Sequence, residues 1–352
     1  MEYFLNPGYY INMFHYVLLA FLIIVFFKSF TDKPYDGLNV LSMVLFLILV
    51  ISIGFRPVHK AFGDMVSYAN FYNSNYKIEK STDIIFYYFT SFLSKLGVSV
   101  NLYFAIIFVL YLTPILIFSK KHFRKLWPYA FLMFLCFFEF FSYGTNGIRN
   151  GVACSIFILA LSFENKKYLR NIFFFLAVIF HFSLIIPVSG YLISLYFQKV
   201  KYFFVLWFSV LIISFFSGNF FTSFFSIFIP ERANYYLNTS DEIIYKTGFR
   251  IDFILYSFIG VLAAYYFILT KKFEDKFYNK LVIVFLFSNS LWLLIIRANF
   301  TNRIAYLSWF ILAPVIIYPL LKTKIFKNQF LKICLIILIF FSVSLYLNVI
   351  RY

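Results

Sequence analysis

The chain has 352 residues, of which 63% are apolar, 25% aromatic and only 13% charged, whereas a soluble domain carries about 25% charged residues. This composition excludes a soluble globular protein. The formal net charge of +17 does not indicate nucleic-acid binding, because the basic residues lie in short connections between apolar segments, as in the cytoplasmic loops of membrane proteins. We therefore expect a polytopic membrane protein that lies in a lipid bilayer and binds no nucleic acid.

Apolar segments near the length that crosses the hydrocarbon core, roughly 20 helical residues, recur along the chain. The first follows Met1-Glu2 without a basic n-region or a small-residue cleavage site, which indicates a retained span rather than a signal peptide. We expect an all-α protein in which residues 1–352 form a single integral membrane domain. The pattern predicts about twelve transmembrane or re-entrant helices, at 9–28, 38–54, 98–118, 127–143, 148–163, 168–183, 184–198, 202–217, 251–270, 279–296, 304–321 and 332–350.

The segment from Tyr168 to Gln198 requires two short helices. One helix over this segment would reach about 46 Å against a hydrocarbon core of about 30 Å. Basic residues flank both ends, so both ends prefer the cytoplasmic side, and Pro187 and Gly190 offer a place for the backbone to break. We expect a short-armed hairpin with its tip between His181 and Ser189.

The basic residues separate by type once the spans are counted across the membrane. The cytoplasmic side receives 19 of the 31 basic residues, and 17 of these are lysine. The outer side receives 12, of which seven are arginine: Arg56, Arg149, Arg232, Arg250, Arg297, Arg303 and Arg351. Orientation needs only positive charge, whereas arginine presents a planar fork of donors that suits phosphate. We expect an anion at the outer face; the alternative is that these arginines extend to lipid headgroups.

Two long segments lie on the predicted outer side. Residues 55–97 contain Asp64, Tyr68 and an amphipathic run from Asp83, which is too short and too polar to cross and predicts an interfacial helix. Residues 218–250 form the second outer loop and lead to Arg250-Ile-Asp252. Arg250 and Asp252 could bind substrate or pair with other charges.

The turn Gly144-Thr-Asn-Gly-Ile-Arg149 joins two predicted spans and places Arg149 in the first turn of the second. A cation there opposes the helix dipole. The unpaired N–H groups of a helix start nevertheless bind anions, and arginine adds donors to them. We therefore predict a phosphate site with Asn146 beside it; the alternative is a tight interhelical turn with its arginine at lipid headgroups.

His181 and Asp64 are the candidate general bases. His181 interrupts an apolar run, and a neutral imidazole accepts a proton near neutral pH; the alternative is a core histidine bonded to a neighbouring helix. Asp64 could act as the base or orient an arginine, or be an ordinary helix-start carboxylate. Arg297 and Arg303 flank a short outer turn and could face one pocket.

At these residues the chain resembles the EpsG-like, Wzy-type bacterial polysaccharide polymerases. The matching motifs are Asp64-x3-Tyr68, Asn146-x-Ile-Arg149, His181-x-Ser183 before an Ile-Pro run, and Asn302-Arg303-Ile-Ala with Pro314 in the following span. The chain departs from the family at Asn150, where a glutamine commonly follows the arginine.

The resemblance implies a glycosyltransferase of O-antigen, capsule or exopolysaccharide biosynthesis. Such an enzyme joins polyprenyl-diphosphate-linked (undecaprenyl) oligosaccharide repeat units at the outer face of the bacterial cytoplasmic (inner) membrane. The implied fold is similar to the multi-span lipid-dependent glycosyltransferases (GT-C-like). A chain-length regulator and a flippase could be its partner proteins.

On this hypothesis His181 or Asp64 deprotonates an acceptor hydroxyl, and Arg149 stabilises the diphosphate leaving group. The substrate-binding residues would be Arg56, Tyr68, Asn146, Arg250, Asp252, Arg297 and Arg303. No metal and no other cofactor is expected. A flippase or other transporter is an alternative, which the one-sided charges and the absence of an inverted repeat disfavour. A one-step glycan ligase needs the same groups and stays open.

Overall fold

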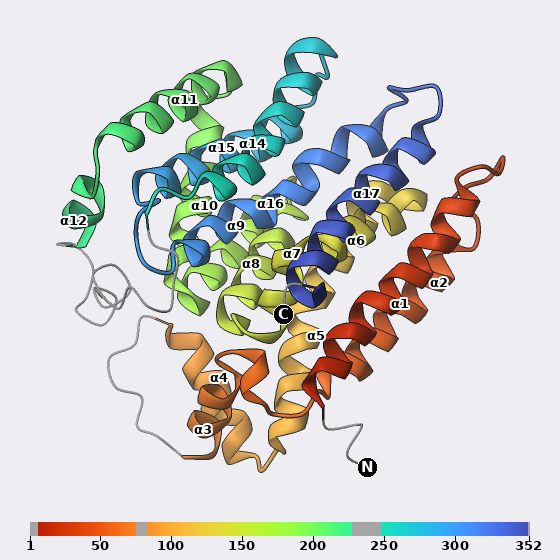
Figure 1. The fold of residues 1–352 in the computed structure, drawn as a ribbon, viewed down its shortest axis with the longest axis vertical. Helices are drawn as coiled ribbons and strands as arrows, with labels where there is room; N and C mark the ends of the chain where they lie inside the picture. Colours follow the sequence, from red (N-terminus) through yellow and green to blue (C-terminus); the bar gives the residue numbers. More distant parts are fainter. Residues whose placement is uncertain (1–5, 75–82, 227–247, 351–352) are drawn as a thin grey trace. The chain divides into compact units, whose positions relative to one another are not determined.

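The computed structural model describes residues 6–74, 83–226 and 248–350, and all regular secondary structure in these ranges is helical (Figure 1). The chain is therefore an all-α polytopic membrane protein, as predicted. Among the described residues, six helical segments are long and apolar enough to cross a membrane: Pro7–Lys28, Val100–Cys136, Ile251–Thr270, Lys276–Leu294, Thr301–Lys322 and Gln329–Ile350. Four shorter segments are also apolar: Leu38–Gly54, Ile148–Leu161, Phe182–Tyr196 and Val200–Phe216. The total of about twelve crossings stays a prediction.

The chain forms two compact units. Unit 1 comprises residues 1–184 and 320–352, and unit 2 comprises residues 185–319. The helices of unit 1 are α1 (Pro7–Lys28), α2 (Leu38–Leu49), α3 (Met65–Asn73), α4 (Ile84–Lys95), α5 (Val100–Phe123), α6 (Trp127–Cys136), α7 (Phe138–Thr145), α8 (Ile148–Leu161), α9 (Lys167–Phe180) and α17 (Gln329–Leu345). Unit 2 contains α10 (Ile185–Tyr196), α11 (Val200–Phe216), α12 (Phe220–Ser226), α14 (Ile251–Tyr265), α15 (Lys276–Leu294) and most of α16 (Thr301–Lys322).

Helix starts follow the polar residues that precede the apolar runs. The side chain of Asn6 accepts a hydrogen bond from the N–H of Gly8 at the start of α1. Ser99 caps α5 in the same way, and its apolar run ends in the basic residues Lys120 and Lys121. These caps satisfy N–H groups that have no intrahelical partner, and the terminal lysines of α5 lie at the negative end of the helix dipole, where positive charge is favourable.

Unit 1 is built around α5 and α8, which pack against each other; α5 also contacts α6, and α8 contacts α7 and α9. The predicted span 127–143 is not one continuous helix. It breaks at Phe137, whose backbone is extended between α6 and α7. The ring of Phe137 stacks on that of Phe340 in α17, with centroids 4.3 Å apart. This tertiary contact is invisible in the local sequence, which contains no proline or glycine at the break.

The predicted break between residues 168 and 198 lies at His181, between α9 and a 3₁₀ turn at Phe182–Leu184. This position is at one end of the predicted tip between His181 and Ser189. Pro187 and Gly190, which were expected to offer the break, lie inside α10 instead. Pro187 is in the first turn of α10, where a missing N–H removes no intrahelical bond. Gly190 instead allows close packing, because a Cβ there would lie 3.1 Å from Cδ1 of Phe287 in α15.

Unit 2 is centred on α15, which packs against α10, α11 and α14. Its core contains a closed polar network around Asn289. The Asn289 amide accepts a hydrogen bond from Nε1 of Trp207 at 2.7 Å and donates to the hydroxyls of Ser257 and Ser308, each at 2.9 Å. Trp309 donates to Ser257 at 2.7 Å. These directional hydrogen bonds connect four helices, α11, α14, α15 and α16.

Candidate functional site

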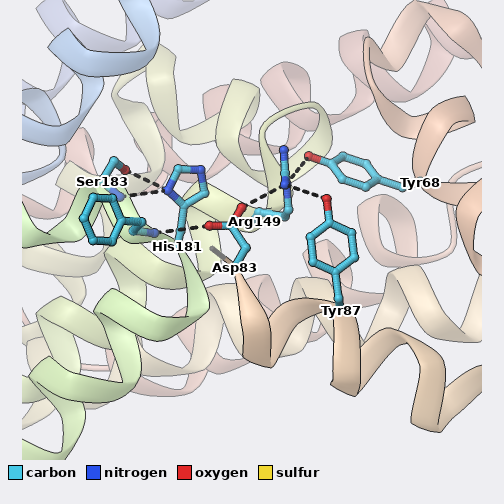
Figure 2. Close-up of polar contacts among 7 residues, drawn as sticks. Tyr68, Asp83, Tyr87, Arg149, His181 and Ser183 are labelled. Atoms are coloured by element: carbon cyan, nitrogen blue, oxygen red, sulfur yellow. Dashed lines mark hydrogen bonds and ion pairs between the residues drawn. The ribbon is translucent and has the colours of Figure 1, made fainter. Parts of the chain in front are cut away.

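Arg149 is the centre of a polar cluster in unit 1. It is the second residue of α8, as predicted, and Gly147 precedes the helix. Its Nε donates a hydrogen bond to the hydroxyl of Tyr68 at 3.2 Å, and its Nη1 donates to the Asp83 carboxylate at 2.8 Å and to the hydroxyl of Tyr87 at 3.0 Å (Figure 2). Three side chains from other segments therefore fix the plane of this guanidinium group.

The segments that contain α3 and α4 supply these three side chains. Tyr68 lies in α3, Asp83 immediately precedes α4, and Tyr87 lies one turn into α4. The backbone N–H of Tyr87 donates to the carbonyl of Asp83, so both side chains extend from the same end of the helix. Because α4 packs against both α3 and α9, the two tyrosines and the carboxylate reach the start of α8 together.

Aromatic rings enclose the guanidinium group as well. The guanidinium carbon of Arg149 lies 5.7 Å from the ring centroid of Tyr68 and 5.8 Å from those of Phe86 and Tyr87. Phe86 is completely buried. The side chain of Arg149 is 23% exposed and that of Asp83 is 8% exposed. The ion pair is thus largely shielded from water, and the rings add cation–π attraction at distances where it is effective.

One nitrogen of Arg149 remains uncommitted. Within the described part of the chain, the hydrogen bonds of Arg149 come from Nε and Nη1, and Nη2 makes none. The single N–H of Nε is used by Tyr68, and Nη1 already donates to two acceptors. In this geometry Arg149 can therefore offer an anion its Nη2 edge, rather than the two-nitrogen fork that arginine presents to a phosphate in the open.

Asp83 connects this cluster to the break at His181. One carboxylate oxygen pairs with Arg149, and the other accepts a hydrogen bond from the backbone N–H of Phe182 at 3.2 Å. Phe182 directly follows His181, which has an extended backbone after the end of α9. A single carboxylate therefore fixes both the guanidinium group and the peptide beside the imidazole, as Figure 2 shows.

The imidazole of His181 is oriented by Ser183. Its Nδ1 accepts a hydrogen bond from the backbone N–H of Ser183 at 3.3 Å and lies 2.8 Å from the Ser183 hydroxyl oxygen (Figure 2). A backbone N–H can only donate, so Nδ1 carries a lone pair and the hydroxyl donates to it as well. In the neutral ring the proton is therefore on Nε2.

Asn146 ties the turn before α8 to the start of α3. Its side-chain oxygen accepts a hydrogen bond from the backbone N–H of Asp64 at 2.9 Å. Gly63 has a φ of +60°, and a Cβ there would collide with the Asn146 amide. Asp64 directly precedes α3, although its carboxylate does not cap the helix. Two residues that were predicted separately, Asp64 and Asn146, are thus in contact, through the backbone N–H of Asp64.

Arg56 lies in a different setting. Its side chain is only 1% exposed, and its terminal nitrogens donate to the carbonyls of Ile53 at 2.8 Å and of Thr145 at 3.0 Å. Thr145 ends α7, and Ile53 lies in the π-helical turn Val50–Gly54 that ends the second apolar segment. A cation at two helix ends is electrostatically favourable. This position favours a structural role for Arg56 over contact with substrate.

In unit 2, Arg250 and Asp252 pair with each other. Nε and Nη2 of Arg250 donate to the two carboxylate oxygens at 2.9 and 2.6 Å. The guanidinium carbon also lies 3.6 Å from the ring centroid of Phe253. These bonds use one full edge of the Arg250 guanidinium group. Of the two alternatives for these charges, the structure therefore shows that they pair with each other, across the start of α14.

The other two predicted arginines of unit 2 flank the α15–α16 turn, as predicted. Among the described residues, Arg297 makes one long hydrogen bond, from Nη2 to the carbonyl of Phe215 at 3.4 Å, and its guanidinium carbon lies 5.1 Å from the ring centroid of Phe249. Arg303 lies in the first turn of α16, with its guanidinium carbon 5.1 Å from the ring centroid of Phe300. Most of the loop 218–250 that precedes these residues, including 227–247, lies outside the described residues.

The structure brings together some predicted site residues and adds others. In unit 1, Tyr68 and Arg149 are in direct contact, and Asp83 connects Arg149 to the peptide that follows His181. Asp83 and Tyr87 were missed as site residues. A signal for them exists, because Asp83-x3-Tyr87 repeats the spacing of Asp64-x3-Tyr68 at the start of the neighbouring helix.

Within the described ranges, no three His, Cys, Asp or Glu side chains come together as a metal site would require.

The comparisons with known proteins identify a family. Neither the curated proteins nor the solved structures give a match to the chain. The sequence profile of the EpsG family matches residues 39–352, a stretch that includes every residue of the Arg149 cluster. The chain therefore belongs to the EpsG family.

Proposed function

We propose that this chain is a glycosyltransferase that polymerises polyprenyl-diphosphate-linked oligosaccharide repeat units at the outer face of the bacterial cytoplasmic membrane. Membership of the EpsG family and the membrane-spanning helices support this proposal. In the proposed reaction, a hydroxyl of one lipid-linked unit attacks the anomeric carbon of another. The bond from that carbon to the diphosphate breaks, and the diphosphate leaves with the electron pair.

The observation that carries the proposal is the fixed guanidinium group of Arg149 with its uncommitted Nη2. Negative charge grows on the diphosphate as its bond to the sugar breaks. A donor that is already held in place stabilises that charge without reorganising, and this is where such donors contribute most to rate. Tyr68, Tyr87 and Asp83 hold Arg149 through Nε and Nη1, which leaves Nη2 without a hydrogen bond among the described residues.

We assign the base to His181 in preference to Asp64. His181 is connected to Arg149 through Asp83 and the peptide of Phe182. An imidazole also accepts a proton near neutral pH, whereas an ordinary carboxylate is a much weaker base. Asp64 supports the site through its backbone N–H, which anchors the Asn146 turn three residues before Arg149.

Arg297 and Arg303 in unit 2 stay as proposed contacts to the diphosphate or the sugars. Arg297 makes only the 3.4 Å hydrogen bond to the Phe215 carbonyl within the described residues, so most of its donors are available to an anion. Arg250 donates along one edge to Asp252. Of the Arg250–Asp252 pair, we therefore expect Asp252, whose side chain is 59% exposed, to meet sugar hydroxyls.

The proposal can be tested in a deletion strain, from which the gene for this chain has been removed. The strain is then complemented with wild-type or variant forms. Glycan length on a gel should show a ladder with the wild type and single repeat units without the chain. Purified wild-type protein should lengthen glycans on lipid-linked units extracted from the deletion strain. If the purified protein leaves those glycans unchanged while the deletion blocks their appearance outside the cell, the chain is a transporter. If it transfers a single unit to a different acceptor, it is a ligase.

A further inference from the structure

Ser183 hydrogen-bonds to Nδ1 of His181 through both its hydroxyl and its backbone. Its hydroxyl donates a hydrogen bond to Nδ1 at 2.8 Å, and its backbone N–H donates to the same atom at 3.3 Å. Both contacts converge on one lone pair. In the neutral ring that lone pair is the place where a proton can be accepted, because Nε2 already carries its proton.

This arrangement separates His181 from a direct role at the substrate. A sugar hydroxyl that approached Nδ1 would have to displace the Ser183 hydroxyl and the peptide N–H behind it. A hydroxyl group, however, donates one hydrogen bond and accepts others. While Ser183 donates to Nδ1, its oxygen lone pairs remain able to accept a proton. Its side chain is half-buried, which leaves part of it open to a ligand.

We propose that Ser183 is a catalytic residue that relays the proton from the acceptor hydroxyl to His181, an inference that rests on the proposed polymerase function. The acceptor hydroxyl transfers its proton to Oγ of Ser183, and Ser183 transfers its own proton to Nδ1. The acceptor oxygen forms the bond to the anomeric carbon, and the bond from that carbon to the diphosphate breaks. The electron pair leaves with the diphosphate, and the imidazole becomes imidazolium.

The surrounding bonds keep this relay in place. Asp83 holds the N–H of Phe182 at 3.2 Å, so the short turn Phe182–Leu184 is fixed at its first residue. The same carboxylate bonds the peptide directly after His181, and negative charge near a developing imidazolium is favourable. The Ser183 N–H would still orient Nδ1 if the hydroxyl were removed, because that bond belongs to the backbone.

Three variants test the relay in purified protein, with lipid-linked units from the deletion strain as substrate. Ser183→Ala removes the hydroxyl, Ser183→Thr keeps one, and Ser94→Ala is the matched control. Ser94 is also half-buried and donates one 2.8 Å hydrogen bond, to the carbonyl of Tyr72. We expect Ser183→Ala to lower kcat about 100-fold with KM unchanged, as loss of general base catalysis does. Ser183→Thr and Ser94→Ala should stay close to wild type.

Two results would overturn the relay: Ser183→Ala as active as Ser94→Ala, or Ser183→Thr as inactive as Ser183→Ala. The wild type offers a test that needs no variant. If two protons move in one step, kcat should fall along a curve as D2O replaces H2O, and a linear or absent dependence would contradict the relay. If the wild type makes no polymer in this assay, the proposed function itself fails. That outcome differs from the variant and solvent results, which concern the relay alone.

Discussion

The carboxylate of Asp83 lies 2.8 Å from Nη1 of Arg149, although the two residues are 66 positions apart in the sequence. The second oxygen of the same carboxylate accepts the N–H of Phe182, 99 positions away. One side chain therefore joins the start of α8, the start of α4 and the break that follows α9. These are the places where the proposed anion-binding group and the proposed base are positioned.

Removing the Asp83 carboxylate should destabilise the protein as well as impair it. Asp83→Ala leaves the largely shielded guanidinium group of Arg149 without its counter-charge, a situation that costs about 3–5 kcal/mol for a buried pair. Because Arg149 is 23% exposed, we expect the lower end of that range. A double-mutant cycle with Arg149→Ala, followed by thermal unfolding in detergent, should give a coupling energy of about 1–3 kcal/mol. Additive effects would show that the two residues do not interact.

Arg149→Lys should abolish most polymer formation while the protein still folds. Lysine keeps the positive charge, but it can occupy neither the Tyr68 position of Nε nor the free Nη2 position at the same time as it pairs with Asp83. Loss of one preorganised donor to a developing anion lowers kcat about 100- to 1,000-fold. The control is Arg124→Lys, which makes the same change at an exposed position. Wild-type ladders from Arg149→Lys would contradict the role of Arg149.

Much of the fold was predictable because the driving force is local and periodic. Long runs of apolar residues between basic connections predict helices close to the observed segments 7–28, 251–270 and 329–350, without any knowledge of tertiary contacts. The break at Phe137 was not predictable, because no proline or glycine marks it, and the ring that stacks on Phe137, that of Phe340, is more than half the chain away. The break at His181 lies at one end of the predicted tip between His181 and Ser189, but Pro187 does not cause it, since proline in the first turn of a helix gives the same local signal as proline at its end.

The candidate site was predictable only in part, for a related reason. Arg149 and Tyr68 could be selected from residue type and position, and the structure joins them. The partner of Arg149 could not be selected, because Asp83-x3-Tyr87 and Asp64-x3-Tyr68 share one spacing, and the spacing alone does not tell which carboxylate reaches Arg149. Arg56 shows the opposite difficulty: its residue type suits an anion, but its two terminal nitrogens bond the carbonyl oxygens of Ile53, in the turn Val50–Gly54, and of Thr145, at the end of α7.

The tyrosine hydroxyls that hold Arg149 should matter individually. Tyr68→Phe and Tyr87→Phe each remove one hydrogen bond to a charged group, which contributes about 1.5–3 kcal/mol. We expect kcat to fall about tenfold or more in each variant, because the Nη2 edge loses its fixed direction. The control is Tyr88→Phe, since Tyr88 lies next to Tyr87 but is 62% exposed. Equal activity of all three variants would exclude this positioning role.

Gly63→Ala should damage the site through the Asn146 turn. Gly63 has a φ of +60°, and its added Cβ would collide with the Asn146 side chain that accepts the N–H of Asp64. The control is Gly97→Ala, at a φ of +71°, where an added Cβ meets nothing within 4 Å. Both substitutions incur the strain of a positive φ, about 1–2 kcal/mol. Only Gly63→Ala should also lower polymerase activity, and similar activity of the two variants would contradict this coupling.

Asn289→Leu should be among the most destabilising single changes in unit 2. It leaves the buried Nε1 of Trp207 without its acceptor and removes the donors to Ser257 and Ser308. Each orphaned buried polar group costs about 1–3 kcal/mol. We expect a loss of about 2–4 kcal/mol in unfolding free energy, compared with almost none for the same change at the exposed Asn328.

A second variant separates the lost hydrogen bonds from altered packing around Asn289. In Asn289→Leu/Trp207→Phe, the orphaned indole N–H is removed together with its acceptor. Replacing both partners of a buried hydrogen bond by apolar groups costs less than replacing one. The second substitution should therefore recover part of the lost stability, even though Trp207→Phe alone removes a buried side chain and destabilises. If the double variant is instead less stable than Asn289→Leu by the full cost of Trp207→Phe, the network does not act through this bond.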